Sequence, residues 1–274
     1  MLIETLSTFP HMYDSVMGES MMKRAQEKGI LEFRAHDLRD WTHDRHRTTD
    51  DDPYGGGAGL VMKCDPIFEA VEAILGKEFV EAKLAAAPPQ GESQQRSSAA
   101  PQIVFLAPQG RPFDDAYADK LAAADHLLFI CGHYEGIDER VYTLADHVIS
   151  LGDYVLTSGE LASMVVIDAA VRKLPGVLGA AEGPVDESFT SGLLEYPQYT
   201  RPADFHGMRV PEVLTSGNHA AIARWRREQS LARTAAARPD LIAAAEAAGR
   251  LTPADQKFLK LLEPAPTGAA EGVS

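Results

Sequence analysis

The sequence is poor in cysteine and has no long apolar run. Its two cysteines, Cys64 and Cys131, exclude a disulfide framework and indicate a reducing compartment. The most apolar stretch, 161–171, is interrupted by Asp168 and is shorter than the ~18 residues of a membrane span. Glu4 stands where a signal peptide carries positive charge. We therefore expect a cytoplasmic protein without a membrane span.

Basic residues are also scarce. The chain has 26 Lys and Arg against 40 Asp and Glu, a net charge of −14. This balance excludes a uniformly basic surface for nucleic acid but permits a local basic patch. Residues 1–189 hold 16 basic against 31 acidic side chains, whereas 190–263 hold 10 against 8. A polyanion would meet least repulsion in the C-terminal part.

Two common nucleotide-binding signatures are missing. No G-x-x-x-x-G-K-[ST] segment occurs, which excludes a P-loop. The glycine run 55–59 follows Asp-Asp-Pro-Tyr, whereas a dinucleotide-binding turn follows a strand. Neither cysteine lies beside an obvious base, which argues against a cysteine nucleophile.

Strand-like and helix-like segments alternate through the first two thirds of the chain. This alternation predicts an α/β layer with a mostly parallel sheet. The expected strands are 1–9, 31–38, 103–107, 127–131, 147–151 and 154–156. The expected helices are 14–28, 66–84, 114–124, 138–144 and 159–173.

Composition divides the chain into parts. The first domain is expected to span 1–174, with a flexible insertion rich in Ala, Pro, Gln and Ser at 85–102. A linker rich in Gly and Pro is expected at 175–189, a helical C-terminal domain at 190–263 and a disordered tail at 264–274. The C-terminal helices are predicted at 218–233, with Asn218 as N-cap, at 239–249 and at 253–262.

Three glycine-containing segments, 106–111, 131–136 and 150–156, each follow an expected strand. Ligands of an open α/β sheet bind beyond the carboxyl ends of its strands. Each segment alone is typical of an ordinary turn. Because the pattern recurs, we expect the three turns to meet at one pocket that offers backbone groups to a small ligand.

The loop 42–62, THDRHRTTDDDPYGGGAGLVM, is the densest polar segment. His43, His46 and the aspartates of 50–52 could bind a metal ion. Alternatively the loop closes over a polar substrate, with Arg45 and Arg47 on phosphate. An exposed polar loop without either role is the third reading.

A second polar cluster surrounds Trp225 in the helix expected at 218–233. It indicates either a solvated helix face with Trp225 in the core, or contact with phosphate. The cluster consists of Arg224, Arg226, Arg227 and Arg233.

Seven motifs in order resemble those of the bacterial tRNA (guanine-N1)-methyltransferases, which belong to the SPOUT class and act on guanosine 37 beside the anticodon. The resemblance runs from the first strand to about residue 262. The motifs are THDRHRTTDDDPYGGGAG, FLAPQGR, CGHYEGIDERV, SLGDYVLTSGEL, LPGVLG, LLEYPQYTRP and VLTSGNHAAIARWRREQSLART.

The resemblance implies a knotted SPOUT α/β domain that binds S-adenosylmethionine, and a small helical C-terminal domain that helps to hold tRNA. It also implies a homodimer with active sites shared between subunits. No residue is assigned to a metal ion. The cofactor residues it implies are Leu106, Ala107, Pro108, Gly132, Glu135, Leu151, Gly152, Asp153, Tyr154, Val155 and Leu156. The substrate residues it implies are Asp50, Tyr54, Gly55, Gly56, Gly57 and Gly59.

Methylation of guanine N1 needs two further groups. Neutral guanine carries a proton on N1, so a general base should remove it while negative charge grows on O6. The resemblance assigns Arg172 to the O6 charge. The family's base is usually an aspartate before Ser-Phe, where this chain has Glu187; we favour Glu187 and keep Asp186 open.

Three smaller departures from the family pattern concern the expected pocket. Ala107 replaces a common Ser, Ser158 a common Gly and His133 a common Arg.

The sequence thus predicts a tRNA guanosine-37 N1-methyltransferase. A related SPOUT enzyme with another RNA target, a non-catalytic RNA-binding dimer and a metal hydrolase using His43 and His46 are the alternatives.

Overall fold

The computed structural model describes residues 1–86, 99–178 and 187–262. The chain divides into two compact units, Met1–Gly183 and Pro184–Ser274, and each is described by itself. Most of the predicted insertion, part of the predicted linker and the whole predicted tail lie outside the described residues.

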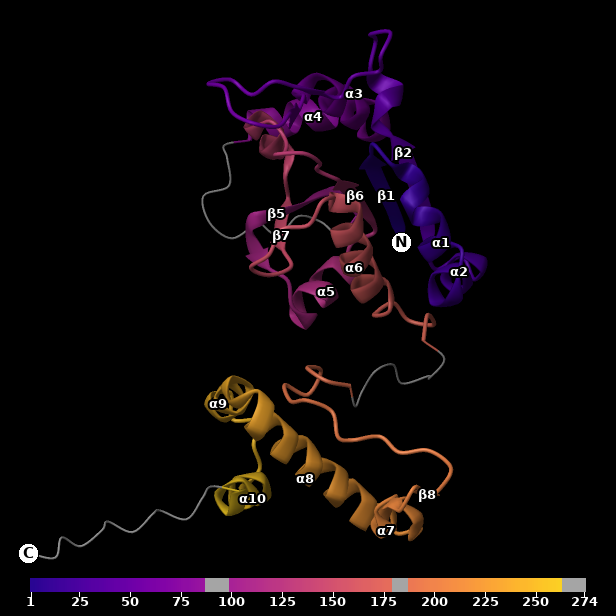
Figure 1. Ribbon diagram of the computed structural model, residues 1–274, viewed down its shortest axis with the longest axis vertical. Coiled ribbons are helices and arrows are strands. Elements are labelled where there is room, and N and C mark those ends of the chain that lie inside the picture. The colour runs from indigo at the N-terminus through magenta and orange to yellow at the C-terminus, as the bar shows by residue number, and fades with distance from the viewer. Residues whose placement is uncertain (87–98, 179–186, 263–274) are drawn as a thin grey trace, which may run out of the picture. The chain divides into compact units, whose positions relative to one another are not determined.

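Five parallel strands form the central sheet of the first unit, in the order β2–β1–β6–β5–β7 (Figure 1). Every pairing between neighbours is parallel. The predicted α/β class with a parallel sheet is confirmed, whereas the knot stays a prediction. The strands are β1 Leu2–Ser7, β2 Glu32–Asp37, β5 Gln102–Pro112, β6 His126–Ile130 and β7 His147–Ser150.

Helices cover both faces of this sheet, with α3 and α4 on the side opposite to α5 and α6 (Figure 1). The central strand β6 feeds both cores, because its successive side chains point to opposite faces. Leu127 and Phe129 are buried in one core, and Leu128 and Ile130 in the other. Each such side chain contributes about 1.5–3 kcal/mol through burial.

One face carries α1 Asp14–Met17, α2 Ser20–Glu27, α5 Asp115–Ala122 and α6 Gly159–Val171, with a short 3-10 helix η1 at Pro10–Tyr13. The other face carries α3 Cys64–Leu75, α4 Lys77–Ala85 and two 3-10 helices, η2 Leu38–Trp41 and η3 Glu139–Leu144.

Two predicted helices are each divided in two. The helix expected at 14–28 is interrupted at Gly18 and Glu19, where the backbone turns extended. The helix expected at 66–84 is interrupted at Gly76, whose φ of 95° is incompatible with an α-helix. Predicting each as continuous was wrong, because the apolar spacing persists across a single non-helical residue, Glu19 in one case and Gly76 in the other.

Two strand predictions also need correction. The strand β5 runs on to Pro112, five residues past its predicted end. Residues 154–156 are not a strand: the sheet ends at Ser150, Gly152 has a φ of 140° and Val155 is 85% exposed. The predicted loop 42–62 contains one short antiparallel pair, β3 Asp50–Asp51 with β4 Val61–Met62.

The second unit is mainly helical, as predicted. Asn218 caps α8 by accepting a hydrogen bond from the Ala221 amide. A small core of Leu193, Leu231, Ala245 and Leu251 joins the helices. The elements are a hairpin of β8 Asp204–Phe205 and β9 Met208–Arg209, which the sequence did not predict, and the helices α7 Glu212–Thr215, α8 His219–Ala237, α9 Pro239–Ala247 and α10 Pro253–Leu262.

Candidate active site

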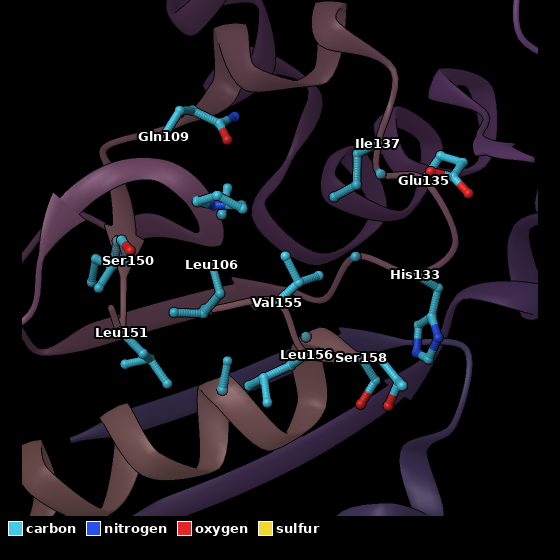
Figure 2. Close-up of a pocket in the computed structure, with 18 of the residues that line it drawn as sticks. Leu106, Gln109, His133, Glu135, Ile137, Ser150, Leu151, Val155, Leu156 and Ser158 are labelled. Atoms are coloured by element: carbon cyan, nitrogen blue, oxygen red, sulfur yellow. The ribbon is translucent and has the colours of Figure 1, made fainter. Parts of the chain in front are cut away.

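A bulge within β5 and the segments that follow β6 and β7 meet at one pocket of about 310 Å³ at the carboxyl edge of the sheet (Figure 2). Leu106, Ser150 and Leu151 stand on one side, and His133 and Glu135 on the other. The convergence that the three post-strand turns predicted is therefore present. The lining comprises residues 106–109, 132–137, 139, 142, 149–152, 154–159 and 162.

The first wall is a bulge inside β5. Leu106 and Arg111 both pair with Ile149 of β7, so the residues between them leave the ladder. Pro108 has no amide proton to donate to a neighbouring strand, which favours such a bulge. Ala107, Pro108 and Gln109 consequently face the pocket instead of extending the sheet.

The start of α6 approaches the turn after β6. The Gly159 amide donates a 2.9 Å hydrogen bond to the Gly132 carbonyl. A Cβ on Gly159 would lie 2.7 Å from the Gly132 nitrogen, so no larger residue fits without moving backbone. The neighbouring Ser158 Oγ is buried in the lining and has no hydrogen-bond partner among the described residues. It is available to a ligand.

A buried polar network lies behind the pocket. Glu160 is fully buried and accepts hydrogen bonds from Ser7 Oγ and from His133 Nε2, the latter at 2.7 Å. Beneath it, Tyr13 hydroxyl lies 2.6 Å from Ser163 Oγ and 3.1 Å from Cys131 Sγ. Burial raises the pKa of Cys131 to about 12, so the thiol stays protonated and is no nucleophile at neutral pH.

The long polar loop is tied to the pocket through the turn after β6. The Glu135 amide donates to the Leu60 carbonyl at 3.1 Å, and the Met62 amide to the Gly136 carbonyl at 3.0 Å. Gly59 packs directly against the Glu135 side chain. The loop thus forms one rim of the pocket.

Tyr134 stands between this loop and the pocket. Its φ of 58° is unusual for a residue with a side chain, and the ring is half exposed. Burial, followed by the Asp50 carboxylate of the loop, raises its pKa. Strain of this kind is common where a side chain is presented to a ligand.

Comparison with known proteins identifies the family. The sequence profile of the tRNA (guanine-1)-methyltransferases (TrmD) matches residues 1–244. The chain belongs to this family.

Three curated relatives, each named tRNA (guanine-N(1)-)-methyltransferase, agree with this assignment. That of Limosilactobacillus reuteri is 50% identical over 90% of this chain and 91% of its own length. That of Symbiobacterium thermophilum is 51% identical over 95% and 97%. That of Geotalea uraniireducens is 48% identical over 96% and 97%. The predicted family and enzyme class are confirmed.

The pocket gathers ten of the eleven residues predicted to bind the cofactor of this methyltransferase. Asp153 is the exception, since it does not belong to the lining although both its neighbours do. Their role in binding stays a prediction.

The residues predicted to bind the substrate lie on the rim loop. Asp50 is half buried in β3, and Tyr54 is fully exposed. All four predicted glycines have positive φ, which permits a backbone path that other residues rarely follow: Gly55, Gly56, Gly57 and Gly59.

The predicted catalytic residues are not in the pocket lining. The helix α6 begins with Gly159 at the pocket and ends just before Arg172. At the rise of an α-helix, its length places Arg172 about 20 Å from Gly159. Glu187 is half buried in the second unit. Asp186 lies outside the described residues.

The metal-site alternative finds no support in the loop. His43 Nε2 lies 2.8 Å from Glu69 Oε2 of α3, in an exposed pair. Hydrogen bonds from Thr48 lower the pKa of Asp44 to about 2 and turn that carboxylate to the backbone. Within the described ranges no group of three His, Cys, Asp or Glu residues is placed to hold a metal ion.

None of the described helices is long and apolar enough to cross a membrane.

Sequence reasoning missed part of the lining. Ile137, Tyr142, Thr157 and Gly159 all contribute to it. A signal existed for Thr157 and Gly159, because the turn after a strand reaches the first residue of the following helix. Ile137 and Tyr142 carried no such signal.

Proposed function

We propose that this chain transfers a methyl group from S-adenosylmethionine to N1 of guanosine 37 in tRNA, in the cytoplasm. Methylation of guanine in tRNA is the reaction for which the family is named. The observation that carries the proposal is the pocket at the strand ends with the glycine-rich loop as its rim. The identity of the methyl donor and the position of the methylated guanosine are additions of this proposal to the reaction in the family name.

The pocket suits a cationic nucleoside ligand. Its volume is at the lower end of the range for small-molecule sites, and leucines 106, 151 and 156 provide apolar contact for an adenine ring. Among its described lining residues, Glu135 and Glu139 are the only carboxylates, and no Lys or Arg is present. S-adenosylmethionine carries sulfonium and ammonium charges that this balance favours. Bound here, it supplies an electrophilic methyl group.

The chain's own residues then act on the guanine. The Glu187 carboxylate would take the N1 proton, so that N1 could accept the methyl group that S-adenosylmethionine would supply. The Arg172 guanidinium stabilises the negative charge that grows on O6. The loop residues Asp50 and Tyr54, with the glycines of 55–59, hold the guanosine at the pocket rim.

The position of Arg172 supports a homodimer. Because Arg172 and Gly159 lie at opposite ends of α6, an arginine side chain cannot span from one end to the pocket at the other. A second copy of the chain would bring its own Arg172 to this pocket. The active site is therefore shared between two subunits.

An exposed apolar patch supports the same assembly. Leu161 and Val165 lie on the outer stripe of α6, and Phe9, Met12 and Val16 lie on and beside η1 and α1. The Tyr13–Ser163 hydrogen bond holds the two elements together. Arg172 lies on the same helix stripe as Leu161 and Val165. Exposed apolar side chains on two elements that touch mark an interaction surface, and a two-fold dimer would bury them.

The proposal is tested with two unmodified tRNA transcripts that differ only in guanosine or adenosine at position 37. Both are incubated with methyl-labelled S-adenosylmethionine and the purified enzyme. We expect label on the guanosine transcript alone. Label on both would move the target to another nucleotide, and no label with cofactor bound would favour a non-catalytic RNA-binding protein.

A further inference from the structure

The second unit has a cavity of its own, of about 220 Å³. One wall is a face of α8, on which Ala223, Arg226, Arg227 and Ser230 recur at helical spacing. The opposite wall is the segment before the hairpin, with Ser191, Leu194, Glu195 and Tyr196. The small side chain of Ala223 leaves room between the walls.

Three of the four arginines that surround Trp225 are occupied by partners within this unit. Arg224 pairs with Glu228 at 2.8 Å. Arg227 forms two hydrogen bonds, of 3.1 and 2.8 Å, with the buried carboxylate of Asp255. Arg233 donates to the Glu195 carbonyl at 3.1 Å. These three side chains have structural roles.

Arg226 differs from the others. Its guanidinium carbon lies 4.8 Å from the centre of the Tyr196 ring. No carboxylate of the described residues lies within ion-pair distance of it, although acidic residues outnumber basic ones in the chain. The Glu195 carboxylate in the same wall instead accepts a hydrogen bond from Gln198. A cationic group at the cavity is therefore left without an anion.

A guanidinium on an aromatic ring is held by its face, which leaves its N–H edge for a ligand. That edge matches two oxygens of a phosphate group, and the tyrosine reduces the entropy lost on binding. We propose that Arg226, supported by Tyr196, binds a backbone phosphate of the tRNA at this cavity. This inference rests on the proposed function, since tRNA supplies the phosphate.

The test compares Arg226→Gln with Arg224→Gln in the full-length enzyme. The two arginines are two residues apart on α8 and therefore point to different faces, yet each substitution removes one positive charge. Affinity for unmodified tRNA is measured by filter binding over a range of salt concentrations. Circular dichroism checks the folding of each variant.

We expect Arg226→Gln to weaken tRNA binding by about fivefold or more and to reduce the slope of log affinity against log salt by about one. Arg224→Gln should change affinity less than about twofold, and Arg226→Lys should retain part of the binding. Tyr196→Leu should weaken binding while the affinity for S-adenosylmethionine stays unchanged.

Equal losses in Arg226→Gln and Arg224→Gln would overturn the site, because net charge alone would explain them. No loss in Arg226→Gln would also overturn it, while leaving the proposed function intact if the wild type still binds and methylates tRNA. Failure of the wild type to bind tRNA would instead overturn the proposed function, and the phosphate site with it.

Discussion

Glu135 of the pocket and Gly59 of the glycine-rich loop touch so closely that no side chain fits between them. A Cβ on Gly59 would lie 2.8 Å from Glu135 Cδ, and closer still to its Cγ. The φ of Gly59 is also positive, at 85°. The proposed substrate loop and the proposed cofactor site are therefore in direct contact at Gly59 and Glu135. Moving either residue should disturb both substrate binding and cofactor binding.

Gly59→Ala tests this contact. The alanine must displace Glu135 and adopt a left-handed backbone, so we expect a loss of about 1–3 kcal/mol in the free energy of unfolding. We also expect kcat/KM for tRNA to fall at least about tenfold, since small displacements at an active site are costly. Gly76→Ala is the matched control, because Gly76 has a φ of 95° but no neighbour within 4 Å of its Cβ. Equal activity in the two variants would contradict a functional contact.

A buried ion pair joins α4 to the start of β7. Lys83 Nζ lies 2.5 Å from Asp146 Oδ2, and both side chains are almost fully buried. We expect Lys83→Met to lower the free energy of unfolding by about 3–5 kcal/mol, because it takes this cation away from a buried carboxylate. In the same helix, Lys77 pairs with Glu81 at the surface, and Lys77→Met should cost less than about 1 kcal/mol. Urea unfolding measures the free energy of unfolding of both variants. Similar losses in the two variants would contradict the expected effect of burial on the ion pair.

His147 should make stability depend on pH. Its Nδ1 lies 2.9 Å from the Tyr117 hydroxyl and its Nε2 2.7 Å from Gln102 Oε1, an environment for the neutral ring. Burial, followed by Lys120, lowers its pKa from 6.5 to about 4. Between pH 6.5 and pH 4 the unfolded chain therefore binds a proton at His147 that the folded chain does not bind. The free energy of unfolding is at its full value above pH 6.5 and falls by about 3 kcal/mol toward pH 4.

Urea unfolding of wild type and His147→Gln at pH 7.5, 6.0 and 5.0 measures this effect. We expect the wild type to lose more stability over this range than the variant. Parallel pH profiles would mean that His147 is not kept neutral by the fold.

The catalytic assignment is tested by Glu187→Gln and Arg172→Ala. Loss of a general base should lower kcat by about 100-fold or more, and loss of the arginine should lower turnover as well. Neither change should alter the affinity for S-adenosylmethionine, because neither residue lies in the pocket lining. Asp186→Asn is the control for Glu187. Full activity in Glu187→Gln with loss in Asp186→Asn would move the base to Asp186.

Much of the first unit was predictable because its strands are short, apolar and regularly followed by turns. The sheet class and the pocket at 106–109, 132–136 and 150–156 follow from that pattern. The order of the strands did not follow, because pairing between β1 and β6 joins segments that lie more than a hundred residues apart. Local spacing carries no information on such contacts.

Errors arose where backbone geometry overrode side-chain character. The apolar run at 154–156 resembles a strand, but Gly152 turns the chain out of the sheet and leaves Val155 exposed. The continuation of β5 beyond its bulge was missed because it is visible only in the pairing of Arg111 with Ile149 of the neighbouring strand. The position of Arg172 at the far end of α6 could not be judged until the pocket was located at its start.

Mixed dimers test the shared active site most directly. One partner carries Arg172→Ala, and the other carries Val155→Arg, which blocks the pocket at an exposed position without touching the core. Each variant alone should have a much lower activity than the wild type. After unfolding and refolding together, half of the dimers are mixed and one of their two sites is intact, so we expect about a quarter of wild-type methyl transfer to tRNA. No recovery of activity, with mixed dimers shown to form, would contradict an active site built from two subunits.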